Sequence, residues 1–403
     1  MLQGKTVVLG VTGSIAAYKM ANVASSLKKL HADVYVLMTK NATNFINPIT
    51  FETLTGHKCL VDTFDRNFNF NIEHVSLAKK ADYFLAAPAS ADVIGKMACG
   101  IADDMLTTTA LACRCPVAVA PAMNTAMYEN AIVQDNLGRL KSFGVTVIEP
   151  ATGNLACGDT GKGKLPPEEL LIAYICRAIA CEKDFAGKRV LVTAGATRER
   201  LDPVRFLTNF STGKMGCAAA KAAMLRGAEV TLVTGAATAE PPEFVNVVKT
   251  ESAEDMYRAV MERREETDIF ILSAAVADFR PEQVAEEKIK KSRVKESYLL
   301  PLVPTKDILK TLGETKRDGQ YLCGFAMETE DLLARAEEKR SAKHADMICA
   351  NSLREAGAGF GGDTNILTLI TARGAETLPV MSKEACAHKI LDRILEETKG
   401  VDA

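Results

Sequence analysis

The sequence has no tryptophan, only five histidines and no apolar run long enough to cross a bilayer, which takes about 20 residues. Its formal net charge is −2, so no excess of one sign favours nucleic acid or an anionic membrane surface. Lys5 interrupts the apolar start, and we therefore expect no secretory signal peptide. These absences exclude a membrane-spanning protein and disfavour a nucleic-acid-binding one.

Cysteine is present, but not in a pattern that holds metal or forms a disulfide framework. There are eleven cysteines, an odd number, and Cys113 and Cys115 form the only close pair. No second pair stands at zinc-ligand spacing, and the histidines are scattered. Reduced thiols and a cytoplasmic location are therefore expected.

Two common nucleotide-binding signatures are also missing. Gly10-Val11-Thr12-Gly13-Ser14 is not the Gly-x-Gly-x-x-Gly turn of dinucleotide-binding proteins. Gly213-Lys214 is followed by Met215, whereas a P-loop requires serine or threonine after the lysine. The second absence disfavours a P-loop ATPase.

One pattern occurs twice and divides the chain. Residues 4–14 and 187–197 both contain a Gly-Lys pair, a short apolar run and a turn of small residues. With 403 residues, two domains are expected. We predict an α/β protein with two Rossmann-like parallel-sheet domains in series, at residues 1–182 and 183–403.

The first domain begins with a strand–helix–strand unit. The predicted helix spans residues 15–30, with Ser14 as its N-cap, and the strands are predicted at 6–9, 34–38, 83–87, 117–120 and 145–148. The turn before the helix either holds an anion or is merely a tight turn. Ligands of parallel sheets bind beyond the carboxyl ends of strands, which makes Ser90, Asp92 and Asn124 a candidate binding rim.

Two further features of this domain admit two readings each. His74 lies at the start of a predicted helix, where a histidine is more often structural than catalytic. Residues 153–165 contain four glycines and Cys157, and we expect them to form neither a good helix nor a good strand. This segment is either a connector or a lid that brings a thiol acid to a ligand.

The second domain carries its polar residues in a long loop and after buried strands. More than 20 residues separate the strand at 190–192 from the helix at 215–226, and such long loops usually carry function. Asp278 follows the strand at 269–272 and binds a metal or a base, or simply caps a turn. Lys339 and Lys343 share a face of a helix predicted at 337–343, either as solvent-exposed charges or as ligands of a triphosphate.

Four motifs of the first half resemble the flavin-containing cysteine decarboxylases, and specifically the decarboxylase half of the bifunctional phosphopantothenoylcysteine decarboxylase/phosphopantothenate–cysteine ligases. They are Gly-Ser-Ile-Ala-Ala-Tyr-Lys at 13–19, Pro-Ala-Ser-Ala-Asp at 88–92, Pro-Ala-Met-Asn-x-x-Met at 121–127 and Ala-Cys-Gly-Asp at 156–159. The resemblance implies an FMN site at Gly13, Ser14, Thr39 and Ser90. It further implies His74 as the active-site histidine, Asn124 as the ligand of the substrate carboxylate and Cys157 as the proton donor. The implied reaction oxidises the cysteine moiety of 4′-phospho-N-pantothenoylcysteine to a thioaldehyde, releases carbon dioxide and then reduces the resulting enethiol, a sequence that needs the cofactor as an electron sink.

The second half resembles the ligase domain of the same family. The matching motifs include Asp202-Pro-Val-Arg205, Asn209-x-Ser-x-Gly-Lys-Met-Gly216 and Ala274-Ala-Val-Ala-Asp-Phe279. The resemblance implies that CTP activates 4′-phosphopantothenate as an acyl-cytidylate, which the amine of cysteine attacks. Asn209 is implied in handling that intermediate and Mg²⁺ in bridging the phosphates, with unknown ligands. The implied nucleotide-binding positions are Ser273, Ala274, Ala275, Asp278, Lys288, Lys306, Asp307, Ile308, Leu309, Phe325, Lys339 and Lys343.

The sequence departs from the family pattern at Glu73, Asp92, Lys164-Leu165 and Thr212. Thr212 retains the hydroxyl of the commoner serine, and we expect the change at 164–165 to be tolerated because Lys164 keeps a cation. By family likeness, the first domain should form trimers and the second dimers, giving a dodecameric homo-oligomer. Two other readings remain. One is a related flavin-prenylating or peptide-cysteine-decarboxylating enzyme, which leaves the second half unexplained. The other is a non-catalytic nucleotide sensor, against which Cys157 and the lysines argue.

Overall fold

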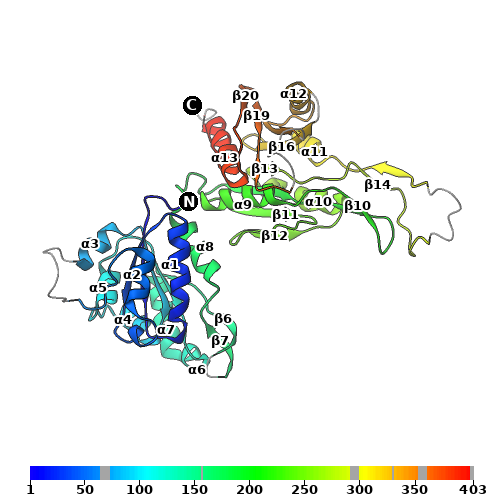
Figure 1. Cartoon of the computed structure of the whole chain (residues 1–403). Helices are drawn as coiled ribbons and strands as arrows, with labels where there is room; N and C mark the ends of the chain where they lie inside the picture. Colours follow the sequence, from blue (N-terminus) through cyan, green and yellow to red (C-terminus); the bar gives the residue numbers. More distant parts are fainter. Residues whose placement is uncertain (64–72, 156–157, 291–298, 329–330, 353–360, 400–403) are drawn as a thin grey trace. The chain divides into compact units, whose positions relative to one another are not determined.

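The computed structural model describes residues 1–63, 73–155, 158–290, 299–328, 331–352 and 361–399. Contacts within the chain separate two units, Met1–Cys181 and Glu182–Ala403, hereafter unit 1 and unit 2. Each unit has an apolar core of its own, built on its own sheet (Figure 1).

Unit 1 is built on a five-stranded sheet in the order β2-β1-β3-β4-β5, and all of its strand pairs are parallel. β3, the central strand, and its neighbour β1 are buried along their whole length. Helices cover both faces of the sheet, which explains the apolar sequences of these strands. All five predicted strands are present: β1 Thr6–Val11, β2 Asp33–Met38, β3 Tyr83–Ala89, β4 Val117–Pro121 and β5 Thr146–Val147.

The predicted first helix starts differently from expectation. It opens as a 3-10 turn, η1 (Ile15–Tyr18), and continues as α1 (Lys19–Lys29). Ser14 caps this turn as predicted, since its hydroxyl accepts a hydrogen bond from the amide of Ala16 at 3.3 Å. The other helices of unit 1 are η2 Ala42–Asn44, α2 Pro48–Thr55, α3 Glu73–Lys80, α4 Ala91–Cys99, α5 Met105–Ala112, α6 Thr125–Glu129, α7 Ala131–Ser142 and α8 Glu168–Ile179.

The prediction that residues 153–165 form no regular structure is wrong. They contribute to an antiparallel hairpin of β6 (Ala151–Asn154) and β7 (Thr160–Lys164). Glycine suits this hairpin because it lies directly on the segment after β4: a Cβ atom on Gly163, whose φ is 139°, would come within 2.2 Å of the carbonyl oxygen of Met123. The amide of Met123 in turn donates to the carbonyl of Gly163 at 3.0 Å.

Unit 2 is built on an eight-stranded sheet in the order β12-β11-β8-β13-β16-β17-β19-β20. The first six strands are parallel, as predicted, whereas the last two add an antiparallel hairpin to the edge. The strands are β8 Arg189–Ala194, β11 Glu229–Thr234, β12 Asn246–Lys249, β13 Ile269–Leu272, β16 Tyr321–Glu328, β17 Met347–Ser352, β19 Thr368–Thr371 and β20 Gly374–Thr377.

Two sets of helices cover the opposite faces of this sheet. The core cluster on one face joins residues of α10, α11 and α12 to inward-pointing strand residues such as Leu191 and Phe270. On the other face α9 packs against β8, β11 and β13 and also contacts α13. The helices are α9 Lys214–Leu225, α10 Ala253–Met261, η3 Arg264–Glu266, α11 Ile308–Thr315, α12 Leu332–Ala342 and α13 Lys383–Lys399.

Short strand pairs lie outside the main sheet of unit 2. The long connection between β8 and α9 contains an antiparallel pair, β9 (Arg198–Arg200) and β10 (Phe206–Thr208). A second pair joins β14 (Phe279–Pro281) to β15 (Leu302–Pro304), and a third joins β18 (Thr364–Asn365) to β21 (Met381–Ser382). β14 lies well away from the main sheet (Figure 1).

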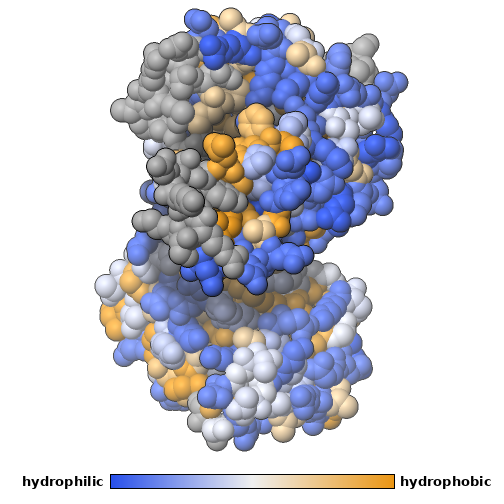
Figure 2. All heavy atoms as spheres, turned by 90° about the vertical axis from the view of Figure 1, so that its right-hand side faces the viewer, coloured by the Kyte–Doolittle hydropathy of each residue, from blue (hydrophilic) through white to orange (hydrophobic). Residues whose placement is uncertain are grey.

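Apolar side chains are exposed on these outlying strands and the loops beside them. Phe210, in the loop after β10, is 92% exposed and Phe279, on β14, 55%, and apolar surface is visible on this face in Figure 2. None of the helices in the described parts of the chain is both long and apolar enough to span a membrane.

Candidate active sites

The first candidate site lies where the chain of unit 1 changes direction across the sheet. From β1 the chain passes to β2 on one side and then to β3 on the other, so β1 and β3 flank a switch point at their carboxyl ends. Thr12 joins the two turns there: its hydroxyl accepts from the amide of Ser90 at 2.9 Å and donates to the carbonyl of Pro88 at 2.7 Å. The rim of the site is thereby fixed by a buried hydrogen-bonded link.

The four residues expected to hold FMN all lie at this edge. Ser14 follows β1, Thr39 follows β2 and Ser90 follows β3, and each hydroxyl accepts an amide hydrogen bond from its own turn, at 3.3, 3.3 and 3.4 Å respectively. A hydroxyl that accepts in this way keeps its hydrogen to donate to a ligand. Gly13 lets the first turn lie against Asn41, whose Cβ would be 2.8 Å from a Cβ at position 13. These hydroxyl donors beside helix N-termini fit a flavin phosphate.

His74 and Asn124 come from different elements of unit 1. His74 is half-buried in the first turn of α3, the helix that leads into the amino end of β3. Asn124 follows β4 and caps α6, and its side-chain amide donates to the carboxylate of Asp159 at 2.9 Å. Asp159 belongs to the hairpin connection and follows the predicted acid Cys157, which lies outside the described residues, by two positions.

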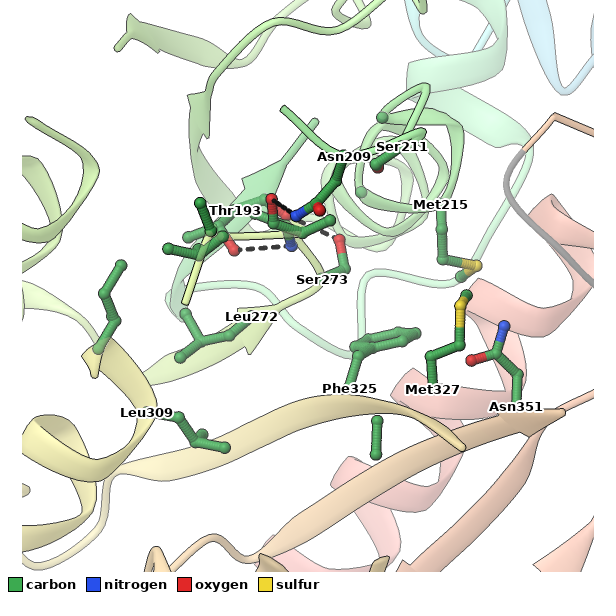
Figure 3. A pocket seen from close by; sticks show the side chains of 18 of the residues that line it. Thr193, Asn209, Ser211, Met215, Leu272, Ser273, Leu309, Phe325, Met327 and Asn351 are labelled. Carbon is green, nitrogen blue, oxygen red and sulfur yellow. Dashed lines mark hydrogen bonds between the residues drawn. The ribbon is translucent and has the colours of Figure 1, made fainter. Parts of the chain in front are cut away.

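The second candidate site is a cavity of about 430 Å³ in unit 2. It opens at the switch point between β8 and β13, because the chain runs from β8 to β11 and β12 on one side before it returns to β13 on the other. Its centre is held by hydrogen bonds between the two strand ends: Ser273 donates to the carbonyl of Thr193 at 2.7 Å (Figure 3). The side chain of Asn209 donates to the carbonyl of Ala275 at 3.0 Å and so projects from the long loop into this centre.

Most of the expected nucleotide-binding residues line this cavity. Lys339, on α12, donates to the carbonyl of Phe325 at 3.0 Å, and Lys343 donates to the carboxylate of Asp307 at 2.6 Å. Partial burial acts to raise the pKa of Asp307, but hydrogen bonds from Lys343 and from the amide of Lys310 outweigh it and hold the pKa below its ordinary value. The expected residues in the lining are Ser273, Ala274, Ala275, Asp278, Lys306, Asp307, Ile308, Leu309, Phe325, Lys339 and Lys343.

Lys288 is the expected nucleotide ligand that the structure does not bring into the cavity. It is exposed and absent from the lining residues. The next residue, Ile289, is bound through its amide to the buried carboxylate of Asp202 at 3.1 Å and through its carbonyl to the guanidinium of Arg205. The Asp202-Pro-Val-Arg205 motif thus anchors the segment that carries Lys288.

No preformed metal cage occurs in the parts of the chain that the structure describes: no group of three or more histidine, cysteine, aspartate or glutamate side chains could hold an ion. Asp278 and Asp307 are the carboxylates among the cavity-lining residues. Mg²⁺ commonly binds through one or two carboxylates together with substrate phosphates and water, so the cavity fits an ion carried in with a nucleotide.

The sequence analysis missed several residues of this cavity. Thr193, Met327, Asn351 and Lys383 line it without having been singled out. One feature of the sequence could have indicated Lys383 as a site residue. It begins the amphipathic C-terminal helix, where a positive charge is unfavourable because it opposes the helix dipole. The others come from ordinary strand sequences and become site residues only through the order of the strands.

Two family models together match nearly the whole chain. The model described as Flavoprotein matches residues 1–180, and the model described as DNA/pantothenate metabolism flavoprotein C-terminal domain matches residues 185–398. A crystal structure of the C-terminal domain of a coenzyme A biosynthesis bifunctional protein CoaBC is 43% identical and covers 54% of this chain and 100% of that chain, with a TM-score of 0.47.

Full-length relatives also match this chain along nearly its whole length. The coenzyme A biosynthesis bifunctional protein CoaBC of Vibrio cholerae is 44% identical over 396 residues, which cover 98% of this chain and 99% of the relative. That of Bacillus subtilis is 45% identical over 403 residues, which cover 99% of this chain and 98% of the relative. The chain therefore belongs to the family of coenzyme A biosynthesis bifunctional proteins.

Proposed function

We propose that the two units catalyse successive reactions of coenzyme A synthesis. Residues 183–403 form a phosphopantothenate–cysteine ligase that uses CTP to join cysteine to 4′-phosphopantothenate. Residues 1–182 form a phosphopantothenoylcysteine decarboxylase that uses FMN to convert 4′-phospho-N-pantothenoylcysteine to 4′-phosphopantetheine. The product of the first reaction is the substrate of the second, which gives one chain a reason to carry both units.

The observation that carries the proposal is the cavity of unit 2. Lysine side chains line it, and the side-chain amide of Asn209 lies at its centre, at the switch point of the sheet. Five lysines and two aspartates line the described cavity, an excess of positive charge that suits a nucleoside triphosphate and a phosphorylated acid. The substrate carboxylate attacks the α-phosphorus of CTP, which releases pyrophosphate and gives an acyl-cytidylate. The amine of cysteine then attacks the acyl carbon and releases CMP. Asn209 lies at the centre of the cavity and is proposed to orient this acyl group.

In unit 1, the position of Ser14, Thr39, Ser90 and Asn124 after the strands of one sheet supports the proposed roles. FMN, when bound, supplies the electron sink that loss of carbon dioxide requires. Ser14, Thr39 and Ser90 would hold it through their hydroxyls, with Gly13 allowing the tight turn. Asn124 would bind the substrate carboxylate, His74 would complete the active site, and Cys157 would donate the proton to the decarboxylated product.

In unit 2, CTP is proposed to bind between α11 and α12. The ammonium groups of Lys339 and Lys343 would neutralise its phosphates, and Asp278 would contact the base or its metal. Mg²⁺ is proposed to enter with the triphosphate. Lys288 is proposed to reach these phosphates from the segment anchored by Asp202 and Arg205.

The assembly is also a proposal. We infer a cytoplasmic homo-oligomer in which unit 1 trimerises and unit 2 dimerises, giving a dodecamer. Exposed apolar side chains on and beside the outlying strands of unit 2, Phe279 on β14 and Phe210 after β10 among them, support a second copy as the partner. Sedimentation equilibrium would measure the mass of the full-chain assembly, proposed to be a dodecamer, and that of unit 2 alone, proposed to be a dimer.

One experiment tests both activities. Purified protein, reconstituted with FMN, receives CTP, Mg²⁺, cysteine and 4′-phosphopantothenate, and pyrophosphate and carbon dioxide are measured separately. The proposal predicts pyrophosphate that depends on CTP, and carbon dioxide that also appears when 4′-phospho-N-pantothenoylcysteine alone is supplied. Pyrophosphate without carbon dioxide would overturn the assignment of unit 1, and carbon dioxide only from the supplied conjugate would overturn that of unit 2.

A further inference from the structure

Two lysines from different helices meet at one end of the unit 2 cavity. Lys214 donates to the carbonyl of Gly361 at 3.0 Å and to the carboxylate of Asp363 at 2.7 Å. Lys383 donates to the carbonyl of Gly362, the residue between them. Both lysines line the cavity, so the 361–363 turn holds two ammonium groups against the same ligand space.

Placing these two cations together is unfavourable for the protein alone. Lys214 is the first residue of α9 and Lys383 the first residue of α13, where the positive end of a helix dipole repels a positive side chain. Lys383 is only 6% exposed. Burial lowers the pKa of Lys383 below its ordinary value, and the positive charge of Lys214 lowers it further, while Asp363 acts in the opposite direction. A bound anion would favour the charged form of both lysines. It would thereby offset the helix dipoles, the burial of Lys383 and the repulsion between the two ammonium groups.

This lysine pair lies apart from the proposed nucleotide ligands. Lys339 lies on α12, and Lys343 directly follows that helix. α9 and α13 cover one face of the sheet, whereas α11 and α12 cover the other. The cavity runs between them over the carboxyl ends of the strands. In Figure 3, Leu309 lies to one side of Phe325, and Asn351 lies to the other side.

The proposed acyl substrate has a matching shape. It carries a carboxylate at one end, which must meet the α-phosphate of the nucleotide, and a phosphate monoester at the other end. With the nucleotide on the α11–α12 side and Asn209 at the centre, the phosphate monoester would extend toward the α9–α13 side. We propose that Lys383 and Lys214 form a second anion subsite of this cavity, which binds the phosphate monoester of the acyl substrate; this rests on the ligase function proposed above.

The test compares phosphorylated and unphosphorylated acyl substrate in the full-length protein. Pyrophosphate release is measured with 4′-phosphopantothenate and with pantothenate, for the wild type and for Lys383→Met. A charge-assisted hydrogen bond contributes enough to change affinity by about 10- to 100-fold. We therefore expect KM for 4′-phosphopantothenate to rise by about that factor, KM for CTP to stay unchanged, and the preference for the phosphorylated substrate to fall in proportion. Lys383→Arg should restore most of that preference.

Controls separate the possible failures. Lys389→Met removes an exposed lysine from the same helix, which pairs with Asp392 at 3.8 Å, and should leave both KM values unchanged. If Lys383→Met does not fold, as judged by its thermal transition, Lys214→Gln is measured in its place and should show the same loss of preference.

Two outcomes would overturn the subsite. One is an unchanged ratio of activities on the two acyl substrates in folded lysine variants, and the other is a rise in KM for CTP alone. A wild-type protein that releases no CTP-dependent pyrophosphate would instead overturn the ligase function itself. Direct titration of the wild type with 4′-phosphopantothenate, followed by its heat of binding, gives a readout that needs no turnover.

Discussion

The hydroxyl of Thr12 accepts a hydrogen bond from the amide of Ser90 at 2.9 Å, and this contact joins the turns after β1 and β3. The same hydroxyl donates to the carbonyl of Pro88, and Thr12 is completely buried. Two of the residues proposed to hold FMN, Ser14 and Ser90, therefore depend for their spacing on a side chain that has no need to touch the cofactor.

Thr12→Val should weaken unit 1 and its hold on FMN. Valine has a similar shape but leaves the Ser90 amide and the Pro88 carbonyl without this partner, at a cost of about 1–3 kcal/mol for a buried group. We expect a lower midpoint in urea unfolding and faster loss of flavin absorbance on gel filtration. Thr12→Ser should behave as the wild type, and Thr43→Val, which removes an exposed hydroxyl bonded to Lys40, serves as control. Full flavin retention by Thr12→Val would contradict the prediction.

Asn124→Asp should detach the β6–β7 hairpin from the segment after β4. The new carboxylate would replace an amide that lies 2.9 Å from the carboxylate of Asp159, so an attraction becomes a repulsion. We expect faster proteolysis of the hairpin and a loss of carbon dioxide release of about 10-fold or more, because the proposed proton donor, Cys157, belongs to the connection of that hairpin.

The double variant Asn124→Asp/Asp159→Asn separates docking from substrate binding. It restores a hydrogen-bonded pair with the roles exchanged, so the hairpin should regain its resistance to protease. Decarboxylation should remain low if Asn124 also binds the substrate carboxylate, because two carboxylates repel. Recovery of both properties would assign Asn124 to docking alone.

Asn209→Ala should separate the two activities. Removing the amide that reaches the carbonyl of Ala275 leaves the centre of the cavity without its orienting group. We expect pyrophosphate-linked ligation to fall by about 100-fold, as for other preorganised donors, and carbon dioxide release from supplied 4′-phospho-N-pantothenoylcysteine to be unchanged. Asn246→Ala, at an exposed position of β12, is the matched control. Equal losses of both activities would show a general structural defect.

The Asp307–Lys343 pair should make unit 2 less stable in acid. The folded pKa of Asp307 is held below its ordinary value, so the carboxylate contributes stability that is complete above about pH 4, its unfolded pKa. That contribution is lost as the pH falls through the lower, folded pKa. Urea unfolding across this pH range should show a smaller loss of the free energy of unfolding for Asp307→Asn than for the wild type. An equal dependence of this free energy on pH in both proteins would contradict the prediction.

The sequence predicted the sheets better than the segments around them. Strands buried on both faces, such as β1 and β13, have continuous apolar sequences, which can be recognised from the sequence alone. The β6–β7 hairpin was not foreseen, because glycine disfavours strands in general and is required here only by the close approach of Met123. The helix with Lys339 begins at Leu332, five residues before its predicted start, since the helix as a whole has only a weakly amphipathic sequence.

The candidate sites were predictable in their residues but not in their arrangement. Family likeness indicated Asn209 and Lys339, but only the strand order brings them to one cavity. Lys383 was missed because its partner Lys214 is far away in sequence and meets it through the packing of α9 against α13. Lys288 was expected in the cavity and instead lies on a neighbouring, anchored segment.

The division of the chain at Cys181 and Glu182, with one core in each unit, has a genetic consequence. A mutation that inactivates one unit need not disturb the other, and the proposed intermediate is a small molecule that diffuses between chains. A cell that carries one copy with Asn209→Ala and another with His74→Gln should therefore grow without added pantetheine, although neither allele supports growth alone. Complementation between the two alleles would then behave as if they belonged to two genes.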